Sequence, residues 1–170
     1  MQFLKSTPED ISVIMELYEA ATAYQHLYTD RVWKGFDPAM IEREIAEGRQ
    51  WKIVIDQQVA CVFLITESDP YIWLEMNADP AVYIHRISTN PAFRGNSFVK
   101  HIINWAKEFA REQNKLFIRV DTGCPNPKLE DYYLRCGFTP KGITHVGETD
   151  TLPKHYQNND YALFEMKVDA

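Results

Sequence analysis

The sequence has 170 residues, of which 45% are hydrophobic and 25% are charged, so it is long enough for one globular domain with a real core. Its net charge of -6 argues against a general nucleic-acid-binding protein, because neutralising phosphates takes a surplus of lysine and arginine. The three cysteines are odd in number and include no C-x-x-C pair, so neither a disulfide framework nor a zinc site is expected.

The sequence carries no targeting signal that we can identify. Its first residues lack the basic and apolar runs of a signal peptide. No apolar stretch approaches the roughly 20 residues that span a bilayer. We therefore expect a single domain over residues 1–170, located in the cytoplasm, with no membrane partner and no nucleic-acid partner.

Two helix starts are marked in the first third of the chain. Thr7 is a good N-cap, and Pro8 suits the first helical position after it. Asp37-Pro38 repeats this signal, and the helix that it begins should end near Gly48. Hydrophobic runs predict the strands of this half of the chain. They cover residues 1–5, 51–55, 59–66 and 71–75, the second and third as an antiparallel hairpin.

The second half alternates between strand and helix patterns. A strand is predicted over 81–89, a helix over 95–113, a strand over 116–121, a helix over 128–136 and a last strand over 160–168. The helix between the first two strands makes a crossover, so these strands should run parallel to each other. The whole order of elements predicts a mixed α/β layout.

One loop has the properties of a phosphate-binding site. After the strand that ends near Thr89, Pro91 begins a turn that leads into a helix with small or polar residues at its start. Such a helix start offers unpaired N–H groups and the positive end of the helix dipole. Gly95 permits close approach of the backbone, and Arg94 supplies a cation. The alternative is an ordinary strand–loop–helix junction with a glycine at a tight turn.

Two motifs resemble those of the GNAT superfamily of N-acyltransferases. The loop is similar to motif A, R/Q-x-x-G-x-G/A after a strand, although Ser97 and Val99 occupy its two small positions. Motif B, N-x-x-A-x-x-x-Y-x-x-x-G-F, is matched better, with Leu129 where alanine is common. The matching residues are Ile87, Thr89, Pro91 and Arg94 for motif A, and Asn126, Tyr133, Gly137 and Phe138 for motif B. The resemblance covers about residues 81–139.

The resemblance implies both a fold and an activity. The fold is α/β (α+β), the GNAT acyl-CoA N-acyltransferase fold, with a mixed sheet of about six to seven strands and helices on both faces. The activity is transfer of an acetyl group from acetyl-CoA to a primary amine by direct attack in a ternary complex. The acceptor is a small-molecule amine or a peptide, and a homodimer is possible. Two alternatives stay open: an inactive module that binds coenzyme A, and an acetyltransferase acting on protein lysines or N-termini.

The resemblance also implies which residues bind the cofactor. Backbone N–H groups of the loop would hold the pyrophosphate, and the preceding strand, splayed at a β-bulge, would bind the pantetheine arm. The residues carried over are Ile87, Ser88, Thr89, Arg94, Gly95, Asn96, Ser97, Phe98, Val99, Asn126 and Tyr133.

Candidate catalytic residues follow from the same resemblance. Tyr133 stands where the family has a general acid that protonates the leaving thiolate. His85 and Glu75 are the candidate bases, and His85 lies on the same strand face as Thr89. The alternative for His85 is a structural histidine capped by a neighbour, and that for Tyr133 is a core aromatic. The four other histidines show no ligand-like spacing, so we expect no metal.

The acceptor site is expected between the first two helices. The family builds it there, and Tyr28 and Trp33 are the candidate substrate-binding residues. An acidic stretch beyond the hairpin is a candidate for attracting a cationic amine, although a solvated acidic loop explains it equally well. The other aromatic or polar residues of the first segment are Tyr24, His26, Arg31 and Phe36, and the acidic stretch comprises Glu67, Asp69, Glu75 and Asp79.

Overall fold

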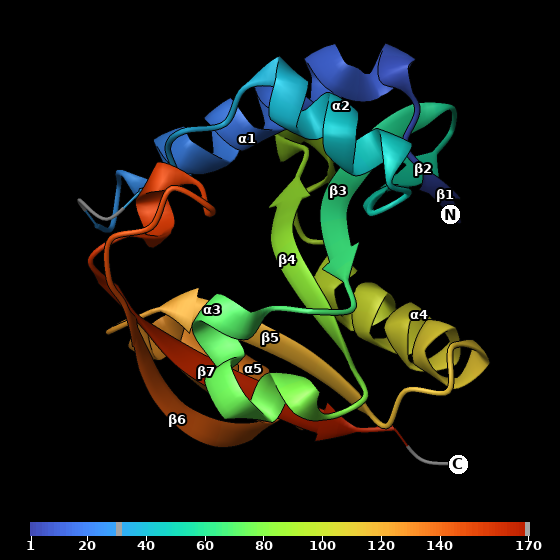
Figure 1. Ribbon diagram of the computed structural model, residues 1–170. Helices are drawn as coiled ribbons and strands as arrows, with labels where there is room; N and C mark the ends of the chain where they lie inside the picture. The colour runs from blue at the N-terminus through green and yellow to red at the C-terminus, as the bar shows by residue number, and fades with distance from the viewer. Residues whose placement is uncertain (30–31, 169–170) are drawn as a thin grey trace. The chain divides into compact units, whose positions relative to one another are not determined.

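The computed structural model describes residues 1–29 and 32–168 and has a seven-stranded mixed sheet. Its strands follow the order β1-β2-β3-β4-β5-β7-β6, and Figure 1 labels the elements. The strands are β1 (Gln2–Lys5), β2 (Gln50–Ile55), β3 (Gln58–Thr66), β4 (Ala81–Thr89), β5 (Phe117–Gly123), β6 (Thr139–Val146) and β7 (Asn159–Lys167). This confirms the predicted fold class.

The helices include five α-helices and several short 3₁₀ turns among the described residues. The α-helices are α1 (Ile11–Gln25), α2 (Pro38–Ala46), α3 (Pro70–Trp73), α4 (Phe98–Glu112) and α5 (Pro127–Arg135). The 3₁₀ turns are η1 (Pro8–Asp10), η2 (Leu74–Ala78), η3 (Pro91–Phe93) and η4 (Lys154–Tyr156). Within the described residues, no helix is long and apolar enough to cross a membrane.

The chain forms two compact units, each assembled from separate stretches of sequence. Unit 1 comprises Met1–Ile65, Arg86–Phe98 and Asp150–His155. Unit 2 comprises Thr66–His85, Val99–Thr149 and Tyr156–Ala170. The sequence expectation of a single domain over residues 1–170 stays a prediction.

Unit 1 begins with the helix starts that the sequence predicts. The Thr7 N–H donates to Asp10 Oδ2 at 2.7 Å, and Lys52 forms an ion pair with the same oxygen at 2.6 Å. Asp37 caps α2, because its Oδ1 accepts from the Met40 N–H at 2.8 Å. The two helices then bury apolar side chains against β3. The buried residues of this cluster are Ile14, Leu17, Tyr18, Ile41 and Val62.

The predicted hairpin is confirmed as β2 and β3, which pair antiparallel up to Ile55 and Gln58. Asp56 and Gln57 make its two-residue loop, with φ angles of 48° and 64°. Positive φ at both central residues is what a tight turn between twisted strands requires.

The strand predicted over residues 71–75 is wrong, because this segment forms α3 and η2 instead. Its aromatic and branched residues suggested a strand, but Asp69-Pro70 repeats the start signal already seen at Asp37-Pro38. Glu75 is consequently exposed on a helical turn. No predicted strand corresponds to β6.

Unit 2 is organised around three neighbouring strands. β4 and β5 are parallel, as predicted from the crossover, with Tyr83 opposite Arg119. β5 pairs antiparallel with β7, which places Arg119 opposite Glu165. Figure 1 shows β5, β7 and β6 side by side.

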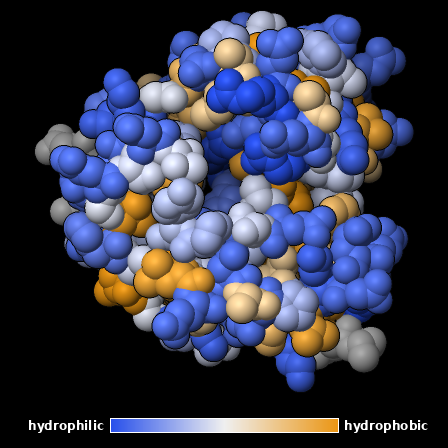
Figure 2. Space-filling model, in the orientation of Figure 1, coloured by the Kyte–Doolittle hydropathy of each residue, from blue (hydrophilic) through white to orange (hydrophobic). Residues whose placement is uncertain are grey.

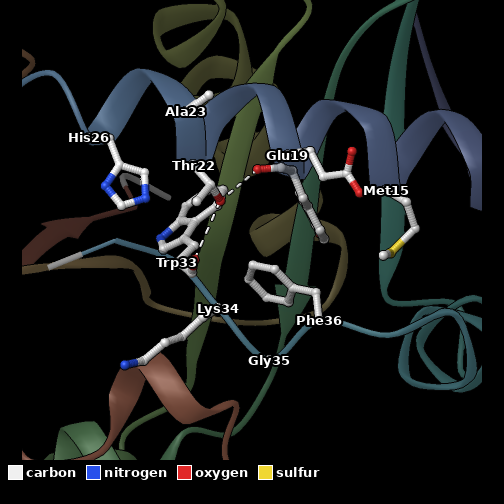
Figure 3. A pocket seen from close by; sticks show the side chains of 10 residues that line it. Met15, Glu19, Thr22, Ala23, His26, Trp33, Lys34, Gly35 and Phe36 are labelled. Atoms are coloured by element: carbon white, nitrogen blue, oxygen red, sulfur yellow. Dashed lines mark hydrogen bonds between the residues drawn. The ribbon is translucent and has the colours of Figure 1, made fainter. Parts of the chain in front are cut away.

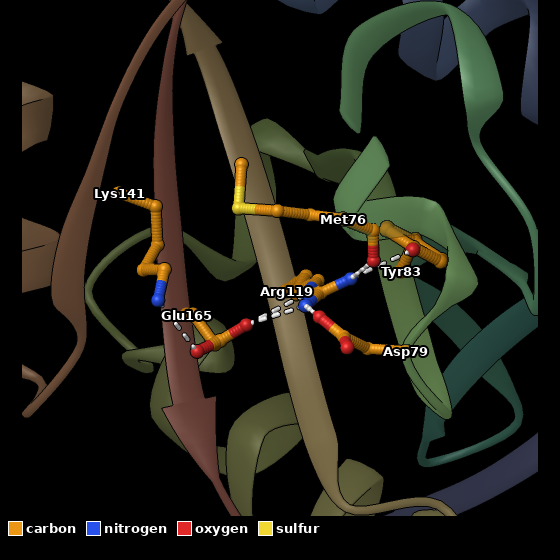
Figure 4. A network of polar contacts seen from close by, with 6 residues as sticks. All are labelled: Met76, Asp79, Tyr83, Arg119, Lys141 and Glu165. Atoms are coloured by element: carbon orange, nitrogen blue, oxygen red, sulfur yellow. Dashed lines mark hydrogen bonds and ion pairs between the residues drawn. The ribbon is translucent and has the colours of Figure 1, made fainter. Parts of the chain in front are cut away.

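The side chain of Arg119 is fully buried at the centre of these strands (Figure 4). Its Nη2 lies 2.6 Å from Glu165 and 2.6 Å from Asp79, while Nη1 donates to the Tyr83 hydroxyl at 3.0 Å. A second bond from Nη1 reaches the carbonyl of Met76 at 2.6 Å. A buried guanidinium is tolerated only when its charge and donors are matched in this way.

The surface drawn in Figure 2 is mostly hydrophilic, and its apolar residues form separate small groups. This agrees with the net charge of -6.

The two carboxylates that contact Arg119 should differ in their effect on stability. Glu165→Gln should lower the free energy of unfolding by about 3 kcal/mol, since it leaves a buried charge without its counter-ion. Asp79→Asn is the matched control: its side chain is 48% exposed, so its loss should cost less than about 1 kcal/mol. Urea denaturation of both variants measures the difference. Equal losses would contradict this view of the network.

Candidate functional site

The loop after β4 is a tight turn with left-handed backbone. Asn90 caps the first turn, because its Oδ1 accepts from the Ala92 N–H at 3.0 Å. Gly95 has a φ of +91° and Ser97 a φ of +51°. An α-helix cannot include such residues, so α4 begins at Phe98 and not at residue 95 as predicted. Gly95 has open space where a Cβ would stand, so the backbone angle alone favours glycine.

The cation of this loop is held by an aromatic ring. The guanidinium carbon of Arg94 lies 4.6 Å from the ring centroid of Tyr24 on α1. Tyr24 in turn packs against Tyr28, with ring centroids 5.2 Å apart. Arg94 itself is exposed, so its charge stays accessible to an anionic ligand. α4 begins at Phe98, and the first N–H groups of an α-helix have no intrahelical acceptor.

The backbone of β4 is irregular near its end, and the β-bulge expected there stays a prediction. Arg86 has a φ of 51°, which breaks the extended conformation just before Ile87. Its guanidinium is buried against Glu44 at 2.5 Å. Ser88 is also buried, and its hydroxyl donates to the Leu17 carbonyl at 2.7 Å, so that side chain has a structural partner. The hydroxyl of Thr89 lies 3.9 Å from the Cys61 sulfur.

Unit 1 contains a cavity of about 360 Å³ (Figure 3). Trp33 and Phe36 supply its aromatic wall, and Glu19, His26 and Lys34 its polar groups. The remaining lining residues are Met15, Tyr18, Thr22, Ala23 and Gly35. Trp33 thus lines this cavity, and its role in binding an acceptor stays a prediction. Tyr28 is 65% exposed and is not among the lining residues. Arg31 lies outside the described residues.

A histidine that sequence reasoning set aside supports this cavity. His155 is buried, packs against Phe36 in a tilted arrangement with ring centroids 5.1 Å apart, and has its Nδ1 3.1 Å from the Lys34 carbonyl. Burial lowers its pKa from 6.5 to about 4, because a charged imidazole would lose its hydration. His155 is thus the neutral form, which donates Nδ1–H to that carbonyl.

His155 should make unit 1 sensitive to acid. Between pH 6.5 and 4 the unfolded chain protonates this histidine and the folded chain does not, so its stabilising contribution is lost as the pH falls. His155→Asn keeps an N–H donor but does not titrate. Its free energy of unfolding should therefore fall by about 3 kcal/mol less than that of the wild type between pH 7 and 4.

Chemical denaturation at several pH values tests this, with His145→Asn, at an exposed histidine, as the control. Burial raises the pKa of Asp69 to about 6, a contribution of opposite sign that is common to all three proteins and cancels in the comparison. Parallel curves for the wild type and His155→Asn would exclude this role of His155.

Unit 2 contains the candidate acid. Tyr133 lies on α5 and is buried, with its ring 5.5 Å from that of Phe164 and 5.8 Å from that of Phe138. Burial raises the pKa of its hydroxyl, and the charge of Asp121 raises it further. The phenol is therefore fully protonated at neutral pH, which a proton donor needs. Its ring packing and its acid role are compatible.

Asn126 forms the N-cap of α5. Its Oδ1 accepts from the Leu129 N–H at 3.3 Å, and its own N–H donates to Glu130 at 2.7 Å. This local role explains the asparagine without a ligand, and its contact with coenzyme A stays a prediction.

The candidate base His85 lies between two aspartates that its sequence neighbours do not reveal. Its Nε2 is 3.4 Å from Asp69 Oδ2, and its Nδ1 is 3.4 Å from Asp121 Oδ1. One ligand atom from each of the three residues lies within 4.8 Å of those of the others. We call these three residues the Asp–His–Asp trio. The sequence missed it because residues 69, 85 and 121 come from three separate elements.

Of the acidic stretch only Asp69 is buried, whereas the side chains of Glu67 and Asp79 are about half exposed. Asp69 is buried in the trio, Asp79 pairs with Arg119, and Glu67 pairs with Lys115 at 2.6 Å. Glu75, the second candidate base, is exposed on η2 and is not part of the trio.

Comparison with known proteins places the chain among acetyltransferases. The model of the acetyltransferase (GNAT) family matches residues 17–138. The uncharacterized N-acetyltransferase YesJ of Bacillus subtilis (strain 168) is 24% identical over 141 residues, which cover 81% of this chain and 71% of that protein.

Solved structures confirm the fold. A GNAT-family acetyltransferase from Listeria monocytogenes has a TM-score of 0.77 and 24% identity, covering 98% of this chain and 94% of that chain. The yncA protein of Salmonella typhimurium, solved with its cofactor acetyl-CoA, has a TM-score of 0.69 and 15% identity, covering 100% of this chain and 95% of that chain.

Proposed function

Because the chain belongs to the acetyltransferase (GNAT) family, we propose that it transfers an acetyl group from acetyl-CoA to a primary amine, by direct attack in a ternary complex. The observation that carries this proposal is the pair of proton-transferring groups in unit 2. Tyr133 is a buried phenol with a raised pKa, and His85 is an imidazole flanked by two carboxylates.

The acetyl donor is proposed to bind through the turn after β4. The turn over Arg94–Ser97, the first N–H groups of α4 and the accessible Arg94 guanidinium suit the pyrophosphate of coenzyme A. The acetyl-CoA in the yncA structure supports this choice of cofactor. Ser97 replaces a family glycine or alanine but keeps its backbone N–H, so the substitution leaves the donor in place.

The reaction requires a definite set of proton transfers. An alkylammonium with a pKa near about 10 loses one proton before its nitrogen can attack the thioester carbon. The C–N bond forms, the C–S bond breaks, and the nitrogen loses a second proton as the amide appears. The departing thiolate regains one proton, so the overall reaction releases one. We assign the first uptake to His85 and the donation to sulfur to Tyr133.

A small-molecule acceptor is supported by the cavity of unit 1. Its volume of about 360 Å³ falls in the range of small-ligand sites, and its aromatic wall suits an amine with an apolar body. The second candidate acceptor is a lysine or N-terminus of a protein. A screen of small amines and of peptides, with release of free coenzyme A thiol as the readout, distinguishes the two kinds of acceptor.

Thermal-shift titration with acetyl-CoA and with free coenzyme A tests the donor site. A ligand that binds only the folded state stabilises it by about 2.7 kcal/mol at a hundredfold excess over Kd, which raises the Tm by roughly 5–10 °C for a chain of this size. A nicotinamide dinucleotide is the control and should leave the Tm unchanged. No rise at millimolar coenzyme A would contradict the proposal, and a rise without thiol release for any amine would indicate an inactive binding module.

Replacing the candidate acid should separate catalysis from binding. Tyr133→Phe keeps the ring packed against Phe138 and Phe164 but removes the donor, so kcat should fall by about 10²–10⁴ with little change in the Kd for acetyl-CoA. Tyr132→Phe, which removes the neighbouring phenol on the same helix, should keep wild-type turnover. Full activity of Tyr133→Phe would remove this residue from the acid role.

A further inference from the structure

The turn after β4 is anchored to the rest of unit 1 by three hydrogen bonds. The Asn90 N–H donates to the Ala60 carbonyl at 2.9 Å, and the side-chain amide of Asn90 donates to the Val59 carbonyl at 3.0 Å. Just before the turn, the Ser88 hydroxyl donates to the Leu17 carbonyl of α1 at 2.7 Å. These bonds fix the base of the turn relative to both β3 and α1, which belong to the same unit.

The helix that is anchored in this way also carries Tyr24. This residue follows Leu17 by about two helical turns, so the two residues lie on the same side of α1. Leu17 is buried, whereas Tyr24 stands near the end of the helix and is 42% exposed. The fold therefore sets the position of the Tyr24 ring relative to the turn, because both are attached to the same stretch of α1 and β4.

The Tyr24 ring restricts a side chain that would otherwise be mobile. Arg94 is exposed on the turn, and its guanidinium carbon lies 4.6 Å from the centroid of the ring, within the range of a cation–π contact. The ring has support of its own, since the Tyr28 hydroxyl donates to the Tyr24 hydroxyl at 3.4 Å. An arginine that is free to change rotamer loses entropy when a ligand orders it, which lowers the affinity. An arginine already held in place loses less.

The ring holds the guanidinium without neutralising its charge. Arg86 and Arg119 are held by carboxylates, those of Glu44 and Glu165, but Arg94 forms no ion pair within residues 1–29 and 32–168. A carboxylate could fix Arg94 equally well, but its negative charge would repel a pyrophosphate. An aromatic face attracts the cation through its quadrupole and leaves the full positive charge for an anionic ligand.

We propose that Tyr24 is a positioning residue of the coenzyme A site, whose ring holds the Arg94 guanidinium in place for the pyrophosphate and leaves its charge intact. The inference rests on the proposed acetyl transfer and deepens it, because it assigns part of the affinity for the cofactor to α1, outside both sequence motifs. Tyr24 acts through Arg94 and contacts none of the reacting atoms.

Binding of free coenzyme A, measured by isothermal titration calorimetry, gives the first test. Tyr24→Leu removes the ring, and the Kd should rise about two- to fivefold, the effect of one cation–π contact at an exposed site. Tyr24→Phe keeps the ring and should bind coenzyme A as the wild type does. An unchanged or lower Kd in Tyr24→Leu would overturn the inference, because the ring would then contribute nothing to Arg94 or would withhold it from the ligand.

A double-mutant cycle tests whether Tyr24 acts through Arg94. Arg94→Gln alone should raise the Kd for coenzyme A at least about tenfold, and Tyr24→Leu should have no further effect in that background. The control is Lys5→Gln, which removes another cation of unit 1, 5.7 Å from the Trp51 ring, and should leave the Kd unchanged. Equal effects of Tyr24→Leu in both backgrounds would place the ring against the ligand itself and would overturn the positioning role.

Steady-state kinetics and a shortened ligand separate positioning from damage to the fold. Tyr24→Leu should raise the KM for acetyl-CoA and leave kcat unchanged. The rise in Kd should be the same for dephospho-coenzyme A, which keeps the pyrophosphate and lacks the 3′-phosphate. A fall in kcat with an unchanged KM would contradict the positioning role, and an effect confined to coenzyme A would overturn the assignment to the pyrophosphate.

The inference and the proposed function fail in different ways. Normal binding and turnover in the wild type, with the same Kd in Tyr24→Leu, would remove the role of Tyr24 and leave the acetyl transfer intact. Absence of coenzyme A binding in the wild type would instead sink the proposed function, and the inference with it.

Discussion

The buried charge of Arg119 is the constraint on which unit 2 depends. A guanidinium with no solvent around it must find acceptors on every side, and it finds them on β7, on β4 and on the turn that precedes β4. These contacts of the Arg119 guanidinium fix the register of β4, β5 and β7 where Tyr83, Arg119 and Glu165 stand opposite one another. The residues one step further along the same face, His85 and Asp121, are then brought to each other by strand geometry alone.

The sequence predicted the framework well because the signals were local. Helix starts at Thr7-Pro8 and Asp37-Pro38, the hairpin and the crossover each depend on neighbouring residues, and each is confirmed. The one strand predicted wrongly lay where an aromatic run competed with a helix start at Asp69-Pro70. The same pattern of a capping residue followed by proline predicted the helix starts at Thr7-Pro8 and Asp37-Pro38. Applied to Asp69-Pro70, it would have predicted a helix here as well.

The candidate site was predicted only in part, for a physical reason. Tyr133 and the turn around Arg94 lie in continuous motifs, so residue spacing exposed them. His155 and Lys34, or Asp69 and Asp121, are brought together by tertiary structure across long stretches of chain, and periodicity carries no information on such pairs. The unexpected α4 start has a simpler cause, since the backbone of Ser97 is left-handed and no composition rule at this position foresees it.

The interleaving of the two units has a consequence for how this protein is made. β4 contributes Ala81–His85 to unit 2 and Arg86–Thr89 to unit 1, so neither unit is a continuous piece of chain. Unit 1 also needs Asp150–His155, and His155 contacts the loop that holds Lys34 and Phe36. During synthesis, therefore, unit 1 cannot be completed when residues 1–65 have been made. It still lacks residues 150–155, which begin about 85 residues further along the chain. Folding must be dominated by contacts between distant residues, and a partly synthesised chain lacks the contacts of His155 with Lys34 and Phe36 until residues 150–155 have been added.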